Sequence, residues 1–187
     1  MRWRLFRGVE KGNPLRYSIP AHPSLPPFKS HLMDKTALVA ALIATLREEL
    51  DAYARASRAA HEAATDPQSK AENKYDTRGL ESSYLARGQA LRAAEAESAL
   101  AQLQSLVLPP PGCVEVGSLV VLGTTAGERT YFLAPAAGGK EITFEGRQIR
   151  VLTPASPLGV TLLDHRTGDR FALEIGGMGM VTVTAVF

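Results

Sequence analysis

The sequence predicts an α+β fold in which an antiparallel helical hairpin precedes a small β-rich domain with one short helix. Three observations predict it. Apolar residues recur every three to four positions up to about residue 106, three prolines follow at 109–111, and apolar residues then come in short runs separated by glycines. The change of period from about 3.6 to about 2 across the prolines therefore divides the chain into a helical part and a β-rich part.

The first 32 residues form a basic tail that we expect to be flexible. They carry six basic residues, one acidic residue and five prolines. Proline fixes φ and lacks a backbone donor, so neither a helix nor a strand is expected here. Met33 directly precedes the helical pattern and is an alternative start of the native chain. Two interpretations of the tail, native and non-native, therefore stay open.

Residues 33–108 are expected to form the hairpin, a coiled coil of two antiparallel helices. The first helix spans 34–64 with Asp34 as its N-cap, and the second spans 68–106. Pro67 breaks the pattern between them, and so short a connection forces the helices antiparallel. The predicted apolar stripes are Leu38, Leu42, Leu46, Leu50, Tyr53, Ser57 and Ala60 in the first helix, and Leu80, Tyr84, Leu91, Ala94, Ala101 and Leu103 in the second.

Residues 109–113 are expected to be a proline-rich linker, and residues 114–187 the β-rich domain. A polyproline run is stiff and extended, and it ends the preceding helix. Short runs rich in β-branched and aromatic residues follow, with glycines between them. The predicted strands are Ser118–Leu122, Thr130–Leu133, Glu141–Phe144, Gln148–Leu152, Arg170–Glu174 and Met180–Phe187.

One short helix is predicted over 157–163, between the fourth and fifth strands. Ser156 is a suitable N-cap, Pro157 suits the first helical position, and Gly168 is expected to cap the exit.

Composition excludes several classes of protein. The lone Cys113 can form no internal disulfide, which favours a reducing compartment and a cytoplasmic location. The four histidines show no metal-ligand spacing. The sequence contains no run of about 18 apolar residues, so no membrane span is predicted. Residues 33–106 carry nine bases and eleven acids, and residues 107–187 six bases and seven acids. The predicted folded part is thus slightly acidic, so we expect no direct sequence-specific binding of nucleic acid.

The run from Ser156 to Asp169 resembles the signature of the C-terminal domain of Gre-type bacterial transcription elongation factors. It reads Ser-Pro-Leu-Gly, then a leucine-rich turn, then Gly168-Asp169 leading into a strand. The run from Val116 to Val121 also resembles the first strand of that domain. The order of parts agrees as well, since both have a helical hairpin, a linker and a β-rich domain. The resemblance covers about residues 34–187.

The resemblance implies a function. It implies an FKBP-like sheet that binds RNA polymerase at the rim of the secondary channel, and a hairpin that reaches down this channel. Acidic residues at the hairpin tip would help to hold Mg²⁺ shared with the polymerase active site, so the factor would stimulate transcript cleavage by the polymerase without being an enzyme itself. The polymerase-binding residues it implies are Ser156, Pro157, Leu158, Gly159 and Asp169.

The predicted tip departs from the family pattern. That pattern has two acids three residues apart, followed by Asn and then Tyr. Glu72 and the following Asn match the second acid and its neighbour, but Ser69 stands at the position of the first acid. Asp66 and Asp76 lie close by in the sequence and could substitute with a different geometry. The candidate tip acids are therefore Glu72, Asp66 and Asp76, with weak or absent stimulation of cleavage as the expectation.

Two alternatives come from other classes of protein. The hairpin could pair with a second hairpin into a four-helix bundle, which would make the chain a scaffold or interaction module. An FKBP-like sheet could also belong to a prolyl isomerase. The sequence shows no Ser/His/Asp set, phosphate loop or metal cluster of its own. We therefore expect a monomer with RNA polymerase as partner, no membrane association and no cofactor of its own.

Overall fold

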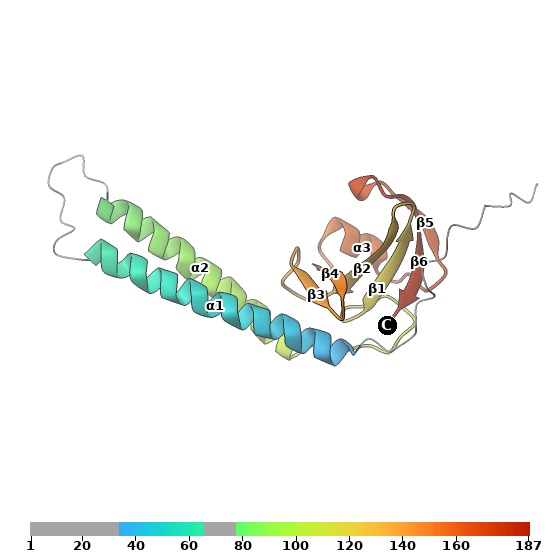
Figure 1. The fold of residues 1–187 in the computed structure, drawn as a ribbon, viewed down its shortest axis with the longest axis horizontal. Coiled ribbons are helices and arrows are strands. Elements are labelled where there is room, and N and C mark those ends of the chain that lie inside the picture. Colours follow the sequence, from blue (N-terminus) through green and yellow to red (C-terminus); the bar gives the residue numbers. More distant parts are fainter. Residues whose placement is uncertain (1–33, 66–77) are drawn as a thin grey trace, which may run out of the picture. The chain divides into compact units, whose positions relative to one another are not determined.

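The computed structural model describes residues 34–65 and 78–187, and it confirms the predicted α+β class. Two long helices are followed by a six-stranded sheet with one short α-helix (Figure 1). The helices are α1 (Lys35–Thr65), α2 (Arg78–Gln104) and α3 (Pro157–Leu162), and η2 (Ile175–Gly177) is a 3₁₀ turn. The strands are β1 (Leu119–Thr124), β2 (Gly127–Leu133), β3 (Glu141–Phe144), β4 (Arg147–Leu152), β5 (Arg170–Leu173) and β6 (Gly179–Val186).

Helix α1 begins and packs as predicted. The Oδ1 atom of Asp34 accepts hydrogen bonds from the backbone N–H groups of Thr36 at 2.9 Å and Ala37 at 3.1 Å, which satisfies two donors of the first turn. The predicted stripe turns inward. Its members Leu38, Leu42, Leu46 and Ala60 are buried, and Leu50, Tyr53 and Ser57 are half-buried.

The predicted apolar stripe of α2 is wrong for most of its members. Leu80, Tyr84 and Leu91 are more than half exposed, and Ala94 and Ala101 are also exposed, so only Leu103 is buried. The side that faces inward has the same spacing of three and four, with mainly small residues along most of its length and leucines only near its C-terminal end. Its members are Gly79, Ser82, Ala86, Gln89, Ala93, Ala96, Leu100 and Leu103.

Small side chains on this inward-facing side of α2, which we call the seam, let the two helices approach closely. The Ser57 hydroxyl donates a hydrogen bond of 3.2 Å to the backbone carbonyl of Ala86, which joins α1 directly to α2. A leucine or tyrosine in place of Ala86 would push the two helices apart. The hairpin is therefore held by leucines near the start of α1 and the end of α2, and by small residues elsewhere.

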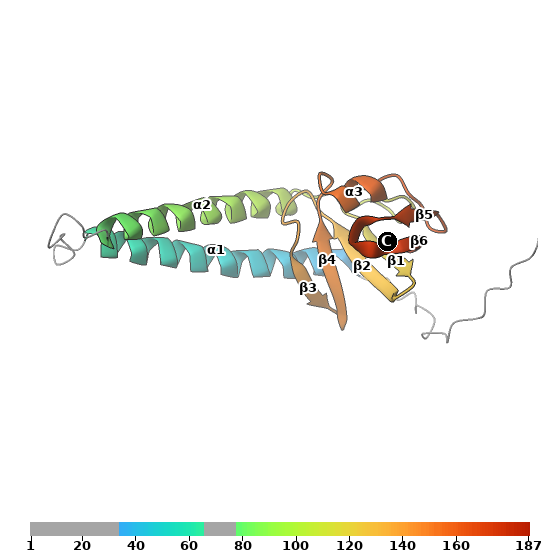
Figure 2. The same ribbon diagram turned by 90° about the horizontal axis from the view of Figure 1, so that it is seen from above.

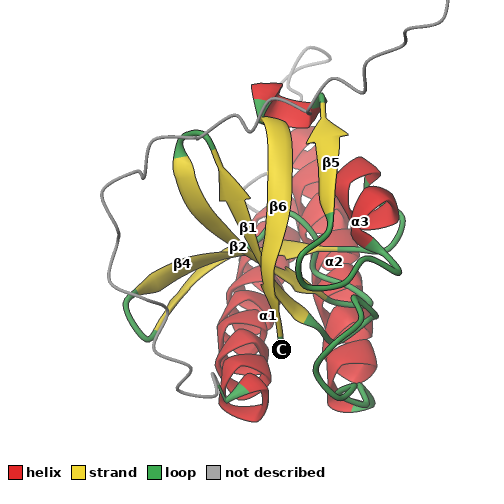
Figure 3. Ribbon diagram, turned by 90° about the vertical axis from the view of Figure 1, so that its right-hand side faces the viewer, coloured by secondary structure: helices red, strands yellow, loops and turns green. Residues whose placement is uncertain are grey.

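The sheet is mixed, and its strand order is β3-β4-β2-β1-β6-β5 (Figures 2 and 3). All neighbouring pairs are antiparallel except β2 and β4, which run parallel with Thr130 opposite Ile149 and Leu133 opposite Leu152. All six predicted strands are present, each shifted by a few residues at most.

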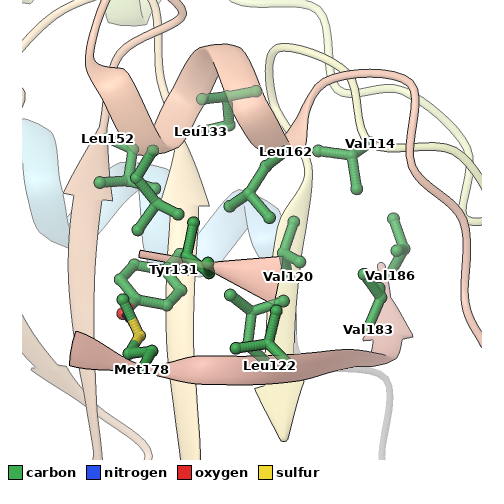
Figure 4. Packing of buried hydrophobic residues seen from close by; sticks show 13 residues of the cluster. Val114, Val120, Leu122, Tyr131, Leu133, Leu152, Leu162, Met178, Val183 and Val186 are labelled. Atoms are coloured by element: carbon green, nitrogen blue, oxygen red, sulfur yellow. Dashed lines mark hydrogen bonds between the residues drawn. The ribbon is translucent and has the colours of Figure 1, made fainter. Parts of the chain in front are cut away.

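Side chains of alternate residues enter two separate cores, one on each face of the sheet. Leu119, Phe132 and Val151 belong to the first core, whereas Val120 and Leu133 belong to the second. The first core is shared with the hairpin, because it includes Leu38, Val39, Leu42, Leu46, Ala99, Leu100 and Leu103. The second core lies under α3 and contains Val114, Tyr131, Leu152, Leu158, Leu162 and Val183 among others (Figure 4).

The described residues, 34–65 and 78–187, belong to one compact unit. Polar contacts supplement the shared core at the base of the hairpin. The Lys35 ammonium donates a hydrogen bond of 2.6 Å to the carbonyl of Pro109, and burial lowers the pKa of this lysine. The Lys140 ammonium lies 2.7 Å from Oε1 of Glu49 in α1, and both side chains are about one-third exposed. A partly exposed ion pair of this kind contributes at most about 1 kcal/mol, so the shared apolar core is the main link.

Neither long helix, nor any other helix in the described part of the chain, has the length and apolarity that crossing a membrane requires.

Candidate functional site

The run that carries the family resemblance folds into a short capped helix and a tight turn. Helix α3 starts at Pro157, as predicted, and Ser156 caps it. The Ser156 hydroxyl accepts the backbone N–H of Gly159 at 3.1 Å and donates to the carbonyl of Thr153 at 2.7 Å. The same oxygen therefore serves both the helix and the turn that precedes it.

Gly159 allows α3 to pack tightly against that preceding turn. A Cβ atom placed on Gly159 would lie only 1.9 Å from the carbonyl oxygen of Thr153 and 2.8 Å from the Ser156 hydroxyl. No side chain fits there, because real Cβ contacts essentially never fall below 3.0 Å. A glycine is thus required at position 159, because the backbone of Thr153 approaches it so closely.

The residues of α3 divide into a buried side and an exposed side. Leu158 is 7% exposed and belongs to the core beneath the helix, together with Leu162. Pro157 is exposed, and Val160, one turn further along, is 61% exposed. The outward side of α3 is therefore apolar. Val160 was not among the residues predicted from the sequence, although its spacing of three from Pro157 places both on one helical face.

The helix ends earlier than predicted, and Gly168 is not its cap. The last helical residue is Leu162, Leu163 is the C-cap, and Asp164 takes the left-handed conformation with φ at 66°. Aspartate tolerates this conformation because its short side chain can form local hydrogen bonds. Gly168 also has a positive φ, of 98°, but it lies in the following turn.

Asp169 closes that turn through its carboxylate. Its Oδ2 atom accepts the backbone N–H of Arg166 at 2.8 Å and lies 3.1 Å from Nδ1 of His165. The hydrogen bond from the backbone of Arg166, and next the bond with His165, lower the pKa of Asp169. The His165 ring stacks on Phe171 with ring centroids 4.3 Å apart, which ties the turn to β5.

The structure thus brings all five predicted polymerase-binding residues into one segment, but gives them different tasks. Ser156 and Gly159 form the turn and cap, Leu158 anchors the helix, and Asp169 closes the second turn. Pro157 alone among them presents an apolar side chain to solvent. The predicted tip residues Asp66, Ser69, Glu72 and Asp76 lie outside the described residues.

A shallow cavity of about 220 Å³ lies over β2, β3 and β4. Its lining includes Arg129, Arg150, Glu128 and Glu141, and its one aromatic residue is Tyr131. Tyr131 is only 4% exposed, and its hydroxyl lies 3.8 Å from the sulfur of Met178 (Figure 4). A charged lining with a single buried aromatic ring does not favour an apolar proline-binding pocket, so the cavity lends no support to the prolyl isomerase alternative.

Among residues 34–65 and 78–187, no group of three or more His, Cys, Asp or Glu side chains is arranged to hold a metal ion.

The Asp169 turn leads to a prediction about acid stability. Because the folded pKa is lowered, the turn stabilises the folded state above the unfolded pKa of about 3.9, and this contribution is lost as pH falls through the folded pKa. Asp169→Asn keeps an acceptor oxygen but removes the charge. We expect a lower urea midpoint than wild type at pH 7, with the difference shrinking as pH falls below about 4.

The matched control for that measurement is Asp51→Asn, on an exposed position of α1. It makes the same change of charge but removes no hydrogen bond or ion pair within the described part of the chain. Its midpoint at pH 7 should stay close to that of wild type. If the Asp169→Asn difference were the same at pH 7 and pH 3, the charge of Asp169 would have no role in the turn.

No protein-family model and no curated protein matches this chain. Solved structures that match it include Gre-type factors. A crystal structure of GreA factor homolog 1 (Gfh1) of Thermus thermophilus is 21% identical and covers 81% of this chain and 93% of its own, with a TM-score of 0.33. Gfh1 of Thermus aquaticus is 20% identical over the same shares, with a TM-score of 0.34.

A GreA/GreB elongation factor from Nitrosomonas europaea is 24% identical, covers 49% of this chain and 78% of its own, and has a TM-score of 0.31. At such identities and TM-scores, a structural likeness assigns no function.

Proposed function

We propose that this chain is a Gre-like factor that binds RNA polymerase and inserts its helical hairpin into the secondary channel. The observation that carries the proposal is the run from Ser156 to Asp169. Each marker residue of this run has a defined place in one small structure, a capped helix followed by a carboxylate-closed turn. That structure stands in a β-rich domain preceded by a helical hairpin, which is the order of parts that the resemblance implies.

The polymerase-facing residues of this run would be Pro157 and Val160. They are the exposed apolar side chains of α3, and apolar groups that lose contact with water on binding contribute most of the affinity of a small interface. Ser156, Leu158 and Gly159 would act indirectly, by fixing the position and direction of this helix. Asp169 would keep the following turn in place.

The hairpin suits a narrow channel. The 31 residues of α1 correspond to a rod about 46 Å long, and the seam of small residues keeps α2 close to it. A rod of two closely spaced helices is slender and stiff, which is what reaching a buried polymerase active site requires.

At the tip, Glu72 with Asp66 or Asp76 would supply the carboxylates that face a Mg²⁺ ion of the polymerase. The ion would stabilise the displacement at phosphorus, and the chain itself would contribute only ligands and position. Ser69 brings a neutral hydroxyl to the place of one family acid. The donor set therefore fits the metal incompletely, and we propose that this factor occupies the channel with little stimulation of cleavage. A factor that binds bacterial RNA polymerase would act in the cytoplasm, where the polymerase is.

Binding of the full chain to core RNA polymerase tests the first part of the proposal. We expect saturable binding, and we expect Val160→Glu to weaken it by about tenfold or more, because a charge would enter an apolar contact. The readout is the fluorescence anisotropy of labelled chain titrated with core polymerase. Far-UV circular dichroism of both proteins verifies that the variant is folded.

The control is Val107→Glu, which makes the same change at a valine that is 83% exposed and lies between α2 and the proline run. Its affinity should equal that of wild type. Failure of the wild-type chain to bind polymerase would reject the proposed function. Binding that Val160→Glu leaves unchanged would retain the partner but reject α3 as the contact.

A further inference from the structure

Helix α2 exposes large apolar side chains on the side turned away from α1. Leu80 is 56% exposed, Tyr84 67% and Leu91 58%. An exposed row of leucine and tyrosine on one helix face is typical of a surface that another molecule covers. The proposed function does not require this row, because the proposed polymerase contacts lie on α3 and at the tip.

These residues form a continuous stripe. Leu80, Tyr84, Arg87 and Leu91 follow one another at intervals of four, three and four residues, so they lie on one face of the helix. We call these four residues the outer face of α2. The small residues of the α1-facing seam, such as Ala86 and Ala93, lie on the opposite side.

The outer face is complementary to itself. Its intervals read the same in both directions, so an antiparallel two-fold pairing of two α2 helices places Leu80 against Leu91 of the second copy. The same register places Tyr84 against Arg87 of the second copy, twice by symmetry. A guanidinium over a tyrosine ring is a favourable contact, and a residue pair that repeats by symmetry is the mark of an isologous interface.

The flanks of the stripe allow such a pairing. A Cβ atom placed on Gly88 would meet nothing within 4 Å, and Ser83 and Ala90 are small, so a second helix could approach closely.

We propose that the outer face of α2 binds a second copy of this chain, forming an antiparallel two-fold dimer through the hairpins. Four apolar or cation–π layers make a small interface, so the dimer is weak and depends on concentration. A paired hairpin is about twice as wide as a single one, so dimerisation would compete with entry into a channel that fits one hairpin. The pairing itself stands independently of the polymerase proposal.

Sedimentation equilibrium of the full chain, without polymerase, tests the dimer. We expect the average mass to rise from one copy towards two between about 1 µM and about 1 mM. Leu91→Glu should raise the dissociation constant at least tenfold, since the two-fold axis introduces two charges into apolar contacts. The control is Leu85→Glu, because Leu85 is 55% exposed on the same helix but lies off the outer face, and it should leave the constant unchanged.

Disulfide cross-linking tests the register, with Cys113→Ser in every variant. A mixture of Leu80→Cys and Leu91→Cys chains should form the mixed disulfide. Either variant alone should form no disulfide. In the proposed register, residue 80 of one copy lies about 16 Å from residue 80 of the other along the helix axes, and the same separation holds for residue 91. A chain that stays monomeric throughout the concentration range would overturn the proposal. So would a dimer that Leu85→Glu weakens as much as Leu91→Glu, or cross-linking of a single variant.

Discussion

Gly159→Ala is expected to destabilise the folded chain by about 3 kcal/mol or more, and so to lower its melting temperature by roughly 6–12 °C. The reason is steric. The new Cβ atom would lie 1.9 Å from the Thr153 carbonyl oxygen, and this neighbour is backbone, which cannot rotate away. The start of α3 would have to move off the turn before it, which would also lengthen the hydrogen bond between Ser156 and Gly159.

The same substitution at Gly88 provides the matched control. Gly88 is an exposed position inside α2 where a Cβ atom meets nothing within 4 Å. Because alanine has a higher helix propensity and restricts the unfolded chain, Gly88→Ala should stabilise the fold by about 0.5–1 kcal/mol. Thermal unfolding is to be followed by circular dichroism at a concentration at which the chain is monomeric.

Equal effects of the two glycine substitutions would show that the close contact at Gly159 is relieved without cost. A destabilisation confined to Gly159 would instead explain why this run requires glycine in terms of folding alone. It would also distinguish the residues of the run that are needed for folding from those on its exposed side, Pro157 and Val160.

Most features set by neighbouring residues were predicted correctly from the sequence, the cap expected at Gly168 being an exception. The caps Asp34 and Ser156 are both confirmed, because a short side-chain acceptor beside the first free N–H groups of a helix acts within three residues. The six strands are confirmed for a similar reason, since their residue types and the glycines between them act locally.

Features set by distant residues were not predictable in the same way. The contact between Gly159 and Thr153, the parallel pairing of β2 with β4 and the core shared by the hairpin and the sheet each depend on how separate segments meet. A glycine in the sequence does not reveal which backbone approaches it, and a valine in a strand does not reveal which strand lies beside it.

The error in α2 has a specific cause. A stripe chosen by hydrophobicity favours Leu80, Tyr84 and Leu91, although the helix turns its smaller residues towards α1. Close packing of two helices rewards small side chains, whereas a count of apolar residues gives alanine, serine and glycine little weight. The large residues that this count selects are those of the outer face, so the error itself points to a second binding surface.

Ser69→Asp is expected to raise transcript cleavage by RNA polymerase at least about tenfold over the wild-type chain, which should itself be feeble. Ser69, Glu72 and their neighbours lie outside the described residues, so the prediction rests on the sequence. Mg²⁺ prefers carboxylate oxygens in near-octahedral geometry, and a neutral hydroxyl is a poorer ligand. Lys70 and Lys74 add positive charge beside it, which disfavours a cation further.

The measurement is the cleavage rate of a backtracked transcript by core polymerase, at concentrations of each variant that saturate binding. The double substitution Ser69→Asp with Glu72→Ala should lose the gain, because a single carboxylate remains at the paired positions. Ser98→Asp, which adds the same charge at an exposed position of α2, should leave cleavage at the wild-type rate. Vigorous cleavage by wild type that Glu72→Ala abolishes would instead show that Asp66 or Asp76 supplies the second carboxylate, and that Ser69 does not stand in the place of the family acid.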